Sequence, residues 1–122
     1  PRPGRGRVSK QDRRDLVRRY RETLRPAGIY RVRHRPSGRS LVGASPDVRS
    51  MFNRIEAQLG FGSIPNKQLQ ADWDAAGRDA FDFDVLDLLD PPDDPNHDVA
   101  ADLATLLDLW RDQLDIDADH RY

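Results

Sequence analysis

The chain has 122 residues, enough for one domain with a single buried core. It contains no cysteine, which excludes disulfides, thiolate nucleophiles and cysteine-based zinc sites. No run of about 18 apolar residues occurs, and the arginine-rich start has no apolar signal-peptide segment, so we expect a cytoplasmic protein with no membrane partner.

The formal net charge of −1 combines two halves of opposite charge. Residues 1–60 carry 16 Lys and Arg against 5 acidic residues, whereas residues 61–122 carry 4 against 16 acidic residues, all of them aspartate. A basic half indicates a polyanionic partner such as nucleic acid. Alternatively, the two halves pack together and neutralise one another. The sequence leaves both interpretations open.

The start of the chain alternates proline, glycine and arginine. Residues 1–8 (PRPGRGRV) are too poor in apolar side chains to fold alone, so we expect a flexible basic arm. Its arginines would contact phosphates without reading a base sequence. Residues 9–122 are predicted to form a single domain.

A basic helix is predicted over residues 10–24. An S-x-x-D start signal related to the capping box precedes it, and Pro26 stops it because proline lacks an amide hydrogen. Its arginines, including the candidate nucleic-acid contacts Arg14 and Arg18, surround a narrow apolar stripe. This helix either covers a sheet edge as a solvated surface helix or follows phosphate groups.

A strand, a tight turn and a second strand follow. The first strand opens with Gly28-Ile29-Tyr30, and a Pro-Ser-Gly turn leads to a second strand over residues 39–43. Along the first strand, Arg31, Arg33 and Arg35 alternate on one face. This row of cations is the strongest candidate in the sequence for phosphate contacts.

An amphipathic helix is predicted after the hairpin. Ser45 is expected at its cap and Pro46 at its first helical position, where the missing donor costs nothing. Gly60 and Gly62 are expected to end the helix. Its predicted core face consists of Val48, Met51, Phe52, Ile55 and Leu59.

The remaining elements alternate between helix and strand. Asn66 is expected to cap a short helix over residues 67–76. Residues 80–88 alternate apolar and aspartate side chains, which predicts a strand. The proline-rich and aspartate-rich stretch 90–96 is expected to be a loop, and a long helix is predicted over residues 97–114.

This order of elements predicts an α+β fold, with a small, three-stranded, mainly antiparallel sheet flanked by helices. The polar tail over residues 115–122 is expected to be frayed. His34, His97 and His120 lack metal-ligand spacing and are expected at the surface or in loops.

Two short motifs on the hairpin carry a family resemblance. Gly28-Ile29-Tyr30 and Leu41-Val42-Gly43 resemble the paired tripeptides of the GIY-YIG nuclease family, with leucine in place of the second tyrosine. The resemblance extends over residues 26–114, through the segment Asn66–Trp73 and the aromatic Trp110 of the last helix. It implies a GIY-YIG-like α+β fold.

The resemblance also implies catalytic roles. Family members use a divalent metal held by one glutamate, a tyrosine that assists the attacking water, and an arginine that stabilises the phosphate charge. Tyr30 matches the first tyrosine, but the positions of the second tyrosine, the arginine and the glutamate hold Leu41, Met51 and Leu107. Arg54, one helical turn after Met51, is the candidate substitute for the arginine. The metal ligands stay unassigned.

The sequence therefore predicts a nucleic-acid-binding domain on a nuclease fold, with cleavage weak or lost and DNA favoured over RNA. Its candidate contacts are Arg14, Arg18, Arg31, Arg33, Arg35 and Asn66. One alternative is an active endonuclease that uses Tyr30 and Arg54, together with His34 and Glu56 or another carboxylate. That enzyme would need Mg²⁺ or Mn²⁺, whereas the binding domain needs no cofactor. Another alternative is a protein-interaction adaptor that retains only the fold.

Overall fold

The computed structural model describes residues 14, 15, 18, 25–90, 92–94 and 96–122. These residues contain the strands β1 (Gly28–His34), β2 (Ser40–Ser45) and β3 (Phe81–Leu88). The strands form one sheet in the order β2-β1-β3, and both neighbouring pairs are antiparallel. The predicted three-stranded antiparallel sheet is confirmed.

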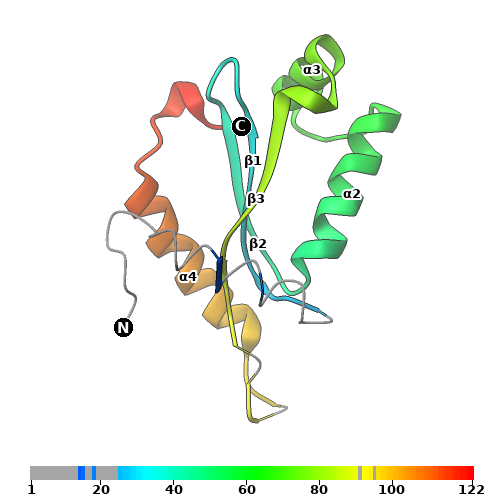
Figure 1. The fold of residues 1–122 in the computed structure, drawn as a ribbon. Helices are drawn as coiled ribbons and strands as arrows, with labels where there is room; N and C mark the ends of the chain where they lie inside the picture. The colour runs from blue at the N-terminus through cyan, green and yellow to red at the C-terminus, as the bar shows by residue number, and fades with distance from the viewer. Residues whose placement is uncertain (1–13, 16–17, 19–24, 91, 95) are drawn as a thin grey trace.

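Helices cover both faces of this sheet. The helices α2 (Val48–Phe61) and α3 (Lys67–Ala76) lie on one side, and α4 (Val99–Leu114) lies on the other (Figure 1). Two short 3-10 helices, η1 (Arg78–Ala80) and η2 (Ala118–His120), precede β3 and the C-terminal residues. The fold is α+β, as predicted. No helix in the described part of the chain has the length and apolar character needed to span a bilayer.

Each face of the sheet has its own hydrophobic core, because residues along β1 point to both faces. Tyr30 and Val32 belong to the core beneath α2 and α3, here the α2-side core. Ile29 belongs to the core beneath α4, here the α4-side core, with Leu106 and Trp110. The other buried members of the α2-side core are Val48, Ile55, Leu59, Leu69 and Phe81.

Asp87 joins β3 to α4. Its buried carboxylate accepts a hydrogen bond from Trp110 Nε1 at 2.9 Å. Gly28 lies so close to this strand that a Cβ added to it would stand 2.1 Å from the Asp87 carbonyl oxygen. The glycine of the first tripeptide is therefore required by the close approach of β1 and β3.

Two helices begin later than predicted. Ser45 is the last residue of β2, and Asp47 caps α2 by accepting a hydrogen bond from a first-turn backbone N–H at 3.1 Å. The Ser45 hydroxyl instead accepts a hydrogen bond from Asp47 N at 3.0 Å, which shapes the turn before the helix. Helix α4 begins at Val99 rather than His97, because Asp98 is its cap.

The predicted helix-end residues Gly62, Asn66 and Gly77 are confirmed, but Gly60 is not. Asn66 Oδ1 accepts a hydrogen bond from Leu69 N at 3.0 Å and caps α3. Gly62 ends α2 with a left-handed φ of 74°, which glycine adopts without steric cost, whereas Gly60 is part of the helix. Gly77 ends α3.

The prediction of a frayed tail is wrong. After η2, Arg121 forms a parallel bridge with Ser40 at the outer edge of β2. Tyr122 N donates a hydrogen bond to Ser40 O at 3.1 Å, and the Tyr122 ring packs against the α2-side core. The polar composition of the tail gave no sign of these contacts because their partners are distant in sequence.

The predictions for the N-terminus fall mostly outside the described residues. The basic arm over residues 1–8 lies wholly outside them, as does most of the helix predicted over residues 10–24. Arg14 and Arg18 are described, and both have helical backbone.

Candidate functional site

Tyr30 lies on the central strand and is 8% exposed. Its ring packs edge-on against Phe52, with the ring centroids 5.9 Å apart. Its hydroxyl lies over Gly43, where an added Cβ would stand 2.5 Å from the hydroxyl oxygen. Burial raises the pKa of Tyr30 above its ordinary value, so the phenol is protonated at neutral pH.

The other three positions that the resemblance makes catalytic hold apolar side chains in the two cores. Leu41 and Met51 pack against the α2-side core, and Leu107 packs against the α4-side core. None of these side chains can ionise, donate a hydrogen bond or supply an oxygen ligand. Of the four positions that the resemblance makes catalytic, Tyr30 alone keeps the residue type that the resemblance implies.

The residues present do not fit the family's metal. Mg²⁺ and Mn²⁺ take oxygen ligands, and Leu107, at the glutamate position, supplies none. The next carboxylate along α4, Asp108, is exposed. Across the described ranges, no group of three or more His, Asp or Glu side chains is arranged to hold a metal ion. No catalytic step is therefore assigned to a metal at this position.

Arg54, the candidate substitute arginine, is exposed on α2. Glu56, on the same helix, pairs with Arg78 at 3.2 Å, and the Arg78 guanidinium lies over the Phe83 ring, 4.5 Å from its centroid. Tyr30 and Glu56 therefore belong to the same side of the sheet. The charge of Glu56 is already balanced by an arginine there.

Arg31 and Arg33 of β1 lie opposite aspartates of β3, whereas Arg35, predicted on the same strand, lies in the turn after β1. The strand register places Arg31 opposite Asp84 and Arg33 opposite Asp82. Arg31 Nη2 lies 3.4 Å from Asp84 Oδ2, and Arg35 Nη1 lies 2.6 Å from Asp82 Oδ1. The Arg33 side chain forms no ion pair with another residue that the structure describes. The basic and acidic halves thus neutralise one another in part along β1 and β3.

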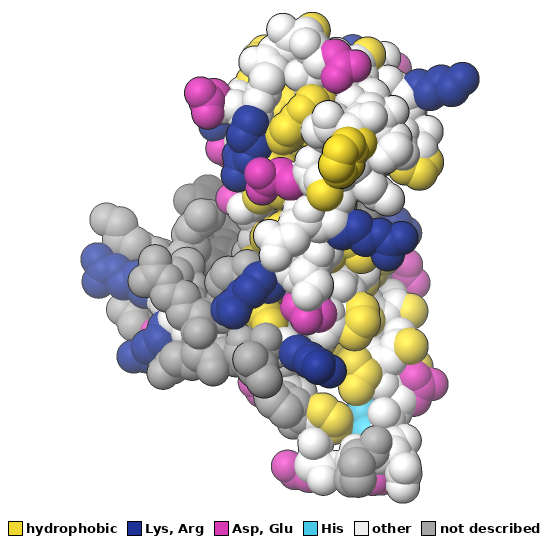
Figure 2. All heavy atoms as spheres, turned by 90° about the vertical axis from the view of Figure 1, so that its right-hand side faces the viewer, with side chains coloured by type: hydrophobic (Ala, Val, Ile, Leu, Met, Phe, Trp, Pro, Cys, Tyr) yellow, Lys and Arg dark blue, Asp and Glu magenta, His cyan; other side chains and the backbone are white. Residues whose placement is uncertain are grey.

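The remaining candidate contacts are dispersed. Arg14 is exposed, and Arg18 forms an exposed ion pair with Asp15 at 3.3 Å. Asn66 uses its side-chain oxygen to cap α3. On the face covered by α2 and α3, Lys and Arg side chains are interspersed with acidic and apolar ones rather than gathered in one patch (Figure 2).

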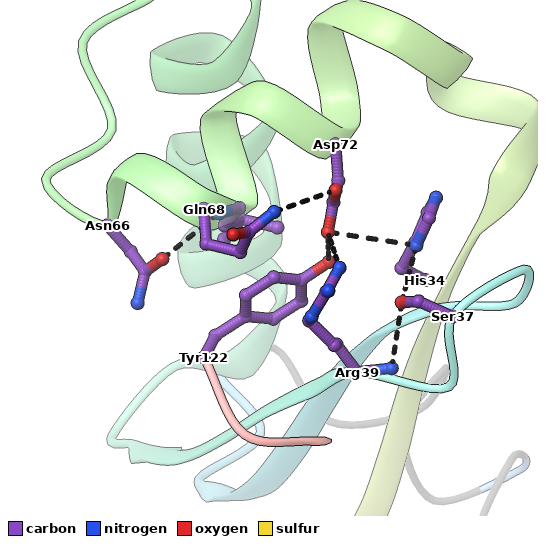
Figure 3. Close-up of polar contacts among 8 residues, drawn as sticks. His34, Ser37, Arg39, Asn66, Gln68, Asp72 and Tyr122 are labelled. Atoms are coloured by element: carbon purple, nitrogen blue, oxygen red, sulfur yellow. Dashed lines mark hydrogen bonds and ion pairs between the residues drawn. The ribbon is translucent and has the colours of Figure 1, made fainter. Parts of the chain in front are cut away.

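A polar cluster that the sequence did not predict connects the hairpin, α3 and the C-terminal tail (Figure 3). Asp72 Oδ2 accepts hydrogen bonds from the Tyr122 hydroxyl at 2.5 Å and from Arg39 Nη1 at 3.0 Å. Asp72 Oδ1 accepts a further bond from Gln68 Nε2 at 3.1 Å. Three separate segments of the chain therefore meet at one carboxylate.

His34 also belongs to this cluster, and the prediction that it lies at the surface or in a loop is wrong. It is 7% exposed, and its ring packs on Phe81 with the centroids 5.0 Å apart. Its Nε2 is buried without a hydrogen-bond partner among the described residues. The signal that could have found it is alternation, because His34 follows Tyr30 and Val32 on the inward-facing positions of β1.

Ser37, His34 and Asp72 do not form a nucleophilic triad. His34 Nδ1 lies 2.7 Å from Ser37 Oγ and 3.7 Å from Asp72 Oδ2, so serine and carboxylate approach the same ring nitrogen. Activation of a serine requires them at opposite nitrogens. The cluster has no geometry for acyl or phosphoryl transfer by this route.

The protonation states of the cluster follow from its contacts. Burial acts to raise the pKa of Asp72, but hydrogen bonds from Tyr122, Gln68 and Arg39 outweigh it and hold the pKa below its ordinary value. Burial and the neighbouring Asp72 carboxylate raise the pKa of Tyr122. An ionised aspartate and a neutral phenol therefore hold the tail against α3.

Comparison with solved structures identifies the fold. The catalytic domain of the homing endonuclease I-TevI aligns with a TM-score of 0.60 and 18% identity, covering 78% of this chain and 96% of that domain. A mutant of the catalytic domain of the intron endonuclease I-TevI aligns with a TM-score of 0.59 and 18% identity, covering 74% of this chain and 84% of that one. No protein-family model and no curated protein matches the sequence.

This chain therefore has the fold of the GIY-YIG nucleases, the class to which the I-TevI catalytic domain belongs. Its sequence has diverged from that of the I-TevI catalytic domain, to which it is 18% identical. The likeness covers about three quarters of this chain.

Proposed function

We propose that this chain is a nucleic-acid-binding domain on the GIY-YIG nuclease fold, with phosphodiester cleavage weak or lost. The observation that carries the proposal is that Leu41, Met51 and Leu107, at the positions that the resemblance makes catalytic, are apolar side chains packed against the two cores. Loss of a single group that stabilises transition-state charge costs on the order of 100-fold in rate. The solved structures that share this fold are catalytic domains of an endonuclease, which supports nucleic acid as the ligand.

Arg33 and Arg54 are the principal proposed phosphate contacts, because neither forms an ion pair within the described part of the chain. Arg31 and Arg35 contact phosphate by exchanging an aspartate partner for it, which makes their contribution smaller. The other proposed contacts are Arg14, Arg18 and Asn66. DNA is the proposed ligand, with RNA as the comparison.

One observation favours a second candidate function, a Mg²⁺- or Mn²⁺-dependent endonuclease. Tyr30 lies in the α2-side core, and Arg54 and Glu56 are both on α2, so all three belong to one side of the sheet. For Glu56 to hold a metal, it would first have to leave Arg78, to which it is bonded at 3.2 Å. This requirement makes the binding domain the preferred proposal.

The test combines binding with cleavage. End-labelled single- and double-stranded DNA and RNA are incubated with the protein in Mg²⁺, Mn²⁺ or EDTA, and binding is titrated against salt. We expect salt-sensitive mobility shifts without cleavage. Arg33→Ala should weaken binding to all sequences alike and reduce the salt slope by about 1, as expected for one lost phosphate contact. Arg25→Ala, which removes an exposed cation that is not among the proposed contacts, is the matched control.

Two outcomes would contradict the proposal. Metal-dependent cleavage that is lost in both Tyr30→Phe and Glu56→Gln would establish the endonuclease instead. Absence of binding to every nucleic acid at low salt would leave the adaptor as the remaining function for this fold.

A further inference from the structure

A pocket of about 310 Å³ lies at the outer edge of β2, between α4 and the C-terminal tail. Val42, Leu114 and Ile116 supply apolar parts of its wall. Because the tail is fixed to β2 by the hydrogen bond from Tyr122 N to Ser40 O at 3.1 Å, the pocket is formed by secondary structure and docked chain together.

The charged side chains that line this pocket are both arginines, Arg111 from α4 and Arg121 from the tail. Neither forms an ion pair with a described residue, although residues 61–122 hold 16 aspartates. Asp115 ends α4 in a left-handed conformation with φ 47°. Its backbone N–H donates a hydrogen bond to the Arg111 carbonyl oxygen, and its carboxylate does not pair with the Arg111 guanidinium. Asp117 pairs with His120 at 2.7 Å. Two like charges without a carboxylate partner give the pocket a preference for an anion.

Ser40 adds a hydroxyl to the pocket lining and is 4% exposed. Its backbone carbonyl is taken by Tyr122, while its hydroxyl bonds to no other residue that the structure describes. A serine hydroxyl at a pocket lined by two arginines can add a donor to their guanidinium groups for a phosphate.

We propose that this pocket binds a nucleotide unit, with Arg111, Arg121 and Ser40 holding its phosphate and the apolar wall contacting its base. The volume is at the lower end of the range for small-molecule pockets, roughly 300–1,000 Å³, and so fits one nucleotide. The inference goes beyond the proposed function, because the residues proposed for polymer contacts do not line this pocket. A free mononucleotide and the phosphorylated end of a strand share the chemistry that the pocket recognises.

The test is calorimetric titration at low ionic strength with adenosine monophosphate, adenosine and ribose 5-phosphate. We expect the monophosphate to bind, and the ligands lacking phosphate or base to bind on the order of tenfold more weakly. Arg111→Ala and Arg121→Ala should each weaken monophosphate binding by about tenfold, since each removes a charge-assisted contact. Lys67→Ala should bind as the unaltered protein does. Unchanged thermal unfolding would show that both arginine variants are folded.

A further arm separates the two sources of the ligand. If the site takes strand ends, a 5′-phosphorylated oligonucleotide should bind more tightly than its unphosphorylated counterpart, and Arg111→Ala should abolish the difference. If the site takes free nucleotides, the two oligonucleotides should bind equally while the monophosphate still binds. The proposal is overturned if the monophosphate does not bind, if both arginine variants bind it normally, or if ribose 5-phosphate binds equally well. Polymer binding without monophosphate binding would overturn this inference alone.

Discussion

The Tyr122 hydroxyl donates a hydrogen bond to Asp72 Oδ2 at 2.5 Å, although the two residues are 50 positions apart in sequence. Arg39 Nη1 bonds to the same oxygen at 3.0 Å, so the hairpin, α3 and the tail are joined through one carboxylate. The tail also lines the pocket that contains Arg111 and Arg121. Because Tyr122 is part of this lining, the shape of the pocket depends on the hydrogen bond between Tyr122 and Asp72.

Tyr122→Phe is expected to lower the free energy of unfolding by about 1.5–3 kcal/mol, because a hydrogen bond to a charged, mostly buried group is lost. Urea denaturation at pH 7 measures this difference. Tyr30→Phe is the matched control, since the described residues offer its hydroxyl no hydrogen bond, and it should cost less. Equal losses in the two variants would contradict the assigned role of the Tyr122 contact.

The contribution of Asp72 should depend on pH in a defined direction. Its pKa is lowered in the folded state, so its stabilising contribution is present above the ordinary value of 3.8 and is lost as pH falls through the folded-state value. The difference in unfolding free energy between the unaltered protein and Tyr122→Phe should therefore be constant near neutral pH and narrow below pH 3.8. At the alkaline end, the raised pKa of Tyr122 predicts a contribution that is retained up to pH 10.0 and lost above it. A difference that does not vary with pH would refute this account.

The local chemistry of the chain predicted its elements well. Periodic apolar residues located α2 and α4, and alternation with aspartates located β3, because these patterns follow directly from helix and strand geometry. Asn66 and Gly62 could be predicted as caps because an asparagine side chain can accept a first-turn N–H and glycine adopts a left-handed conformation without steric cost. The start of α2 was misplaced because Ser45 and Asp47 both suit a cap, and only the end of β2 decides between them.

Contacts between distant segments could not be predicted in the same way. The tail has a polar composition, and nothing in it indicates that Tyr122 reaches Asp72. The pairing of Arg31 with Asp84 depends on β1 and β3 being neighbours, which the spacing of the two motifs does not establish. The sequence therefore predicted the candidate residues themselves. Their ion-pair partners, such as Asp84 for Arg31, follow from the strand order and could not be predicted from the sequence.

Gly43→Ala is expected to destabilise the domain by about 1–3 kcal/mol, as overpacking of a core does. The added Cβ would lie 2.5 Å from the Tyr30 hydroxyl and 2.7 Å from its Cζ, so the ring would have to move. The same substitution made in a Tyr30→Leu background should cost much less, because the clashing atoms are gone. A double-mutant cycle measured by urea denaturation checks this, and additive losses would show that the Tyr30 ring is not what requires glycine.

Two glycines near the end of α2 should respond in opposite directions to alanine. Gly60 is within the helix, and a Cβ there would meet nothing within 4 Å, so Gly60→Ala should stabilise by about 0.5–1 kcal/mol through helix propensity. Gly62 has a φ of 74°, so Gly62→Ala should destabilise by roughly 1 kcal/mol. Thermal unfolding of both variants measures the contrast. The same sign of change at both positions would contradict the observed helix end.

Removing the aspartates that pair with Arg31 and Arg35 should strengthen nucleic-acid binding if those arginines reach phosphates. The ion pairs of Arg31 and Arg35 with Asp84 and Asp82 are partly exposed, so the double substitution Asp82→Asn and Asp84→Asn should change stability by no more than about 1 kcal/mol. It should raise DNA affinity several-fold and steepen the salt slope by about 1 to 2, because two guanidinium groups become available.

The control for this experiment is the double substitution Asp93→Asn and Asp108→Asn, which changes the net charge equally at exposed positions outside β1 and β3. If both double variants gain the same affinity, the effect is one of net charge alone and the arginines of β1 are not contacts. A gain confined to the β3 variant would place the phosphate path along β1, where the chain holds its cations against its own carboxylates until a stronger anion replaces them.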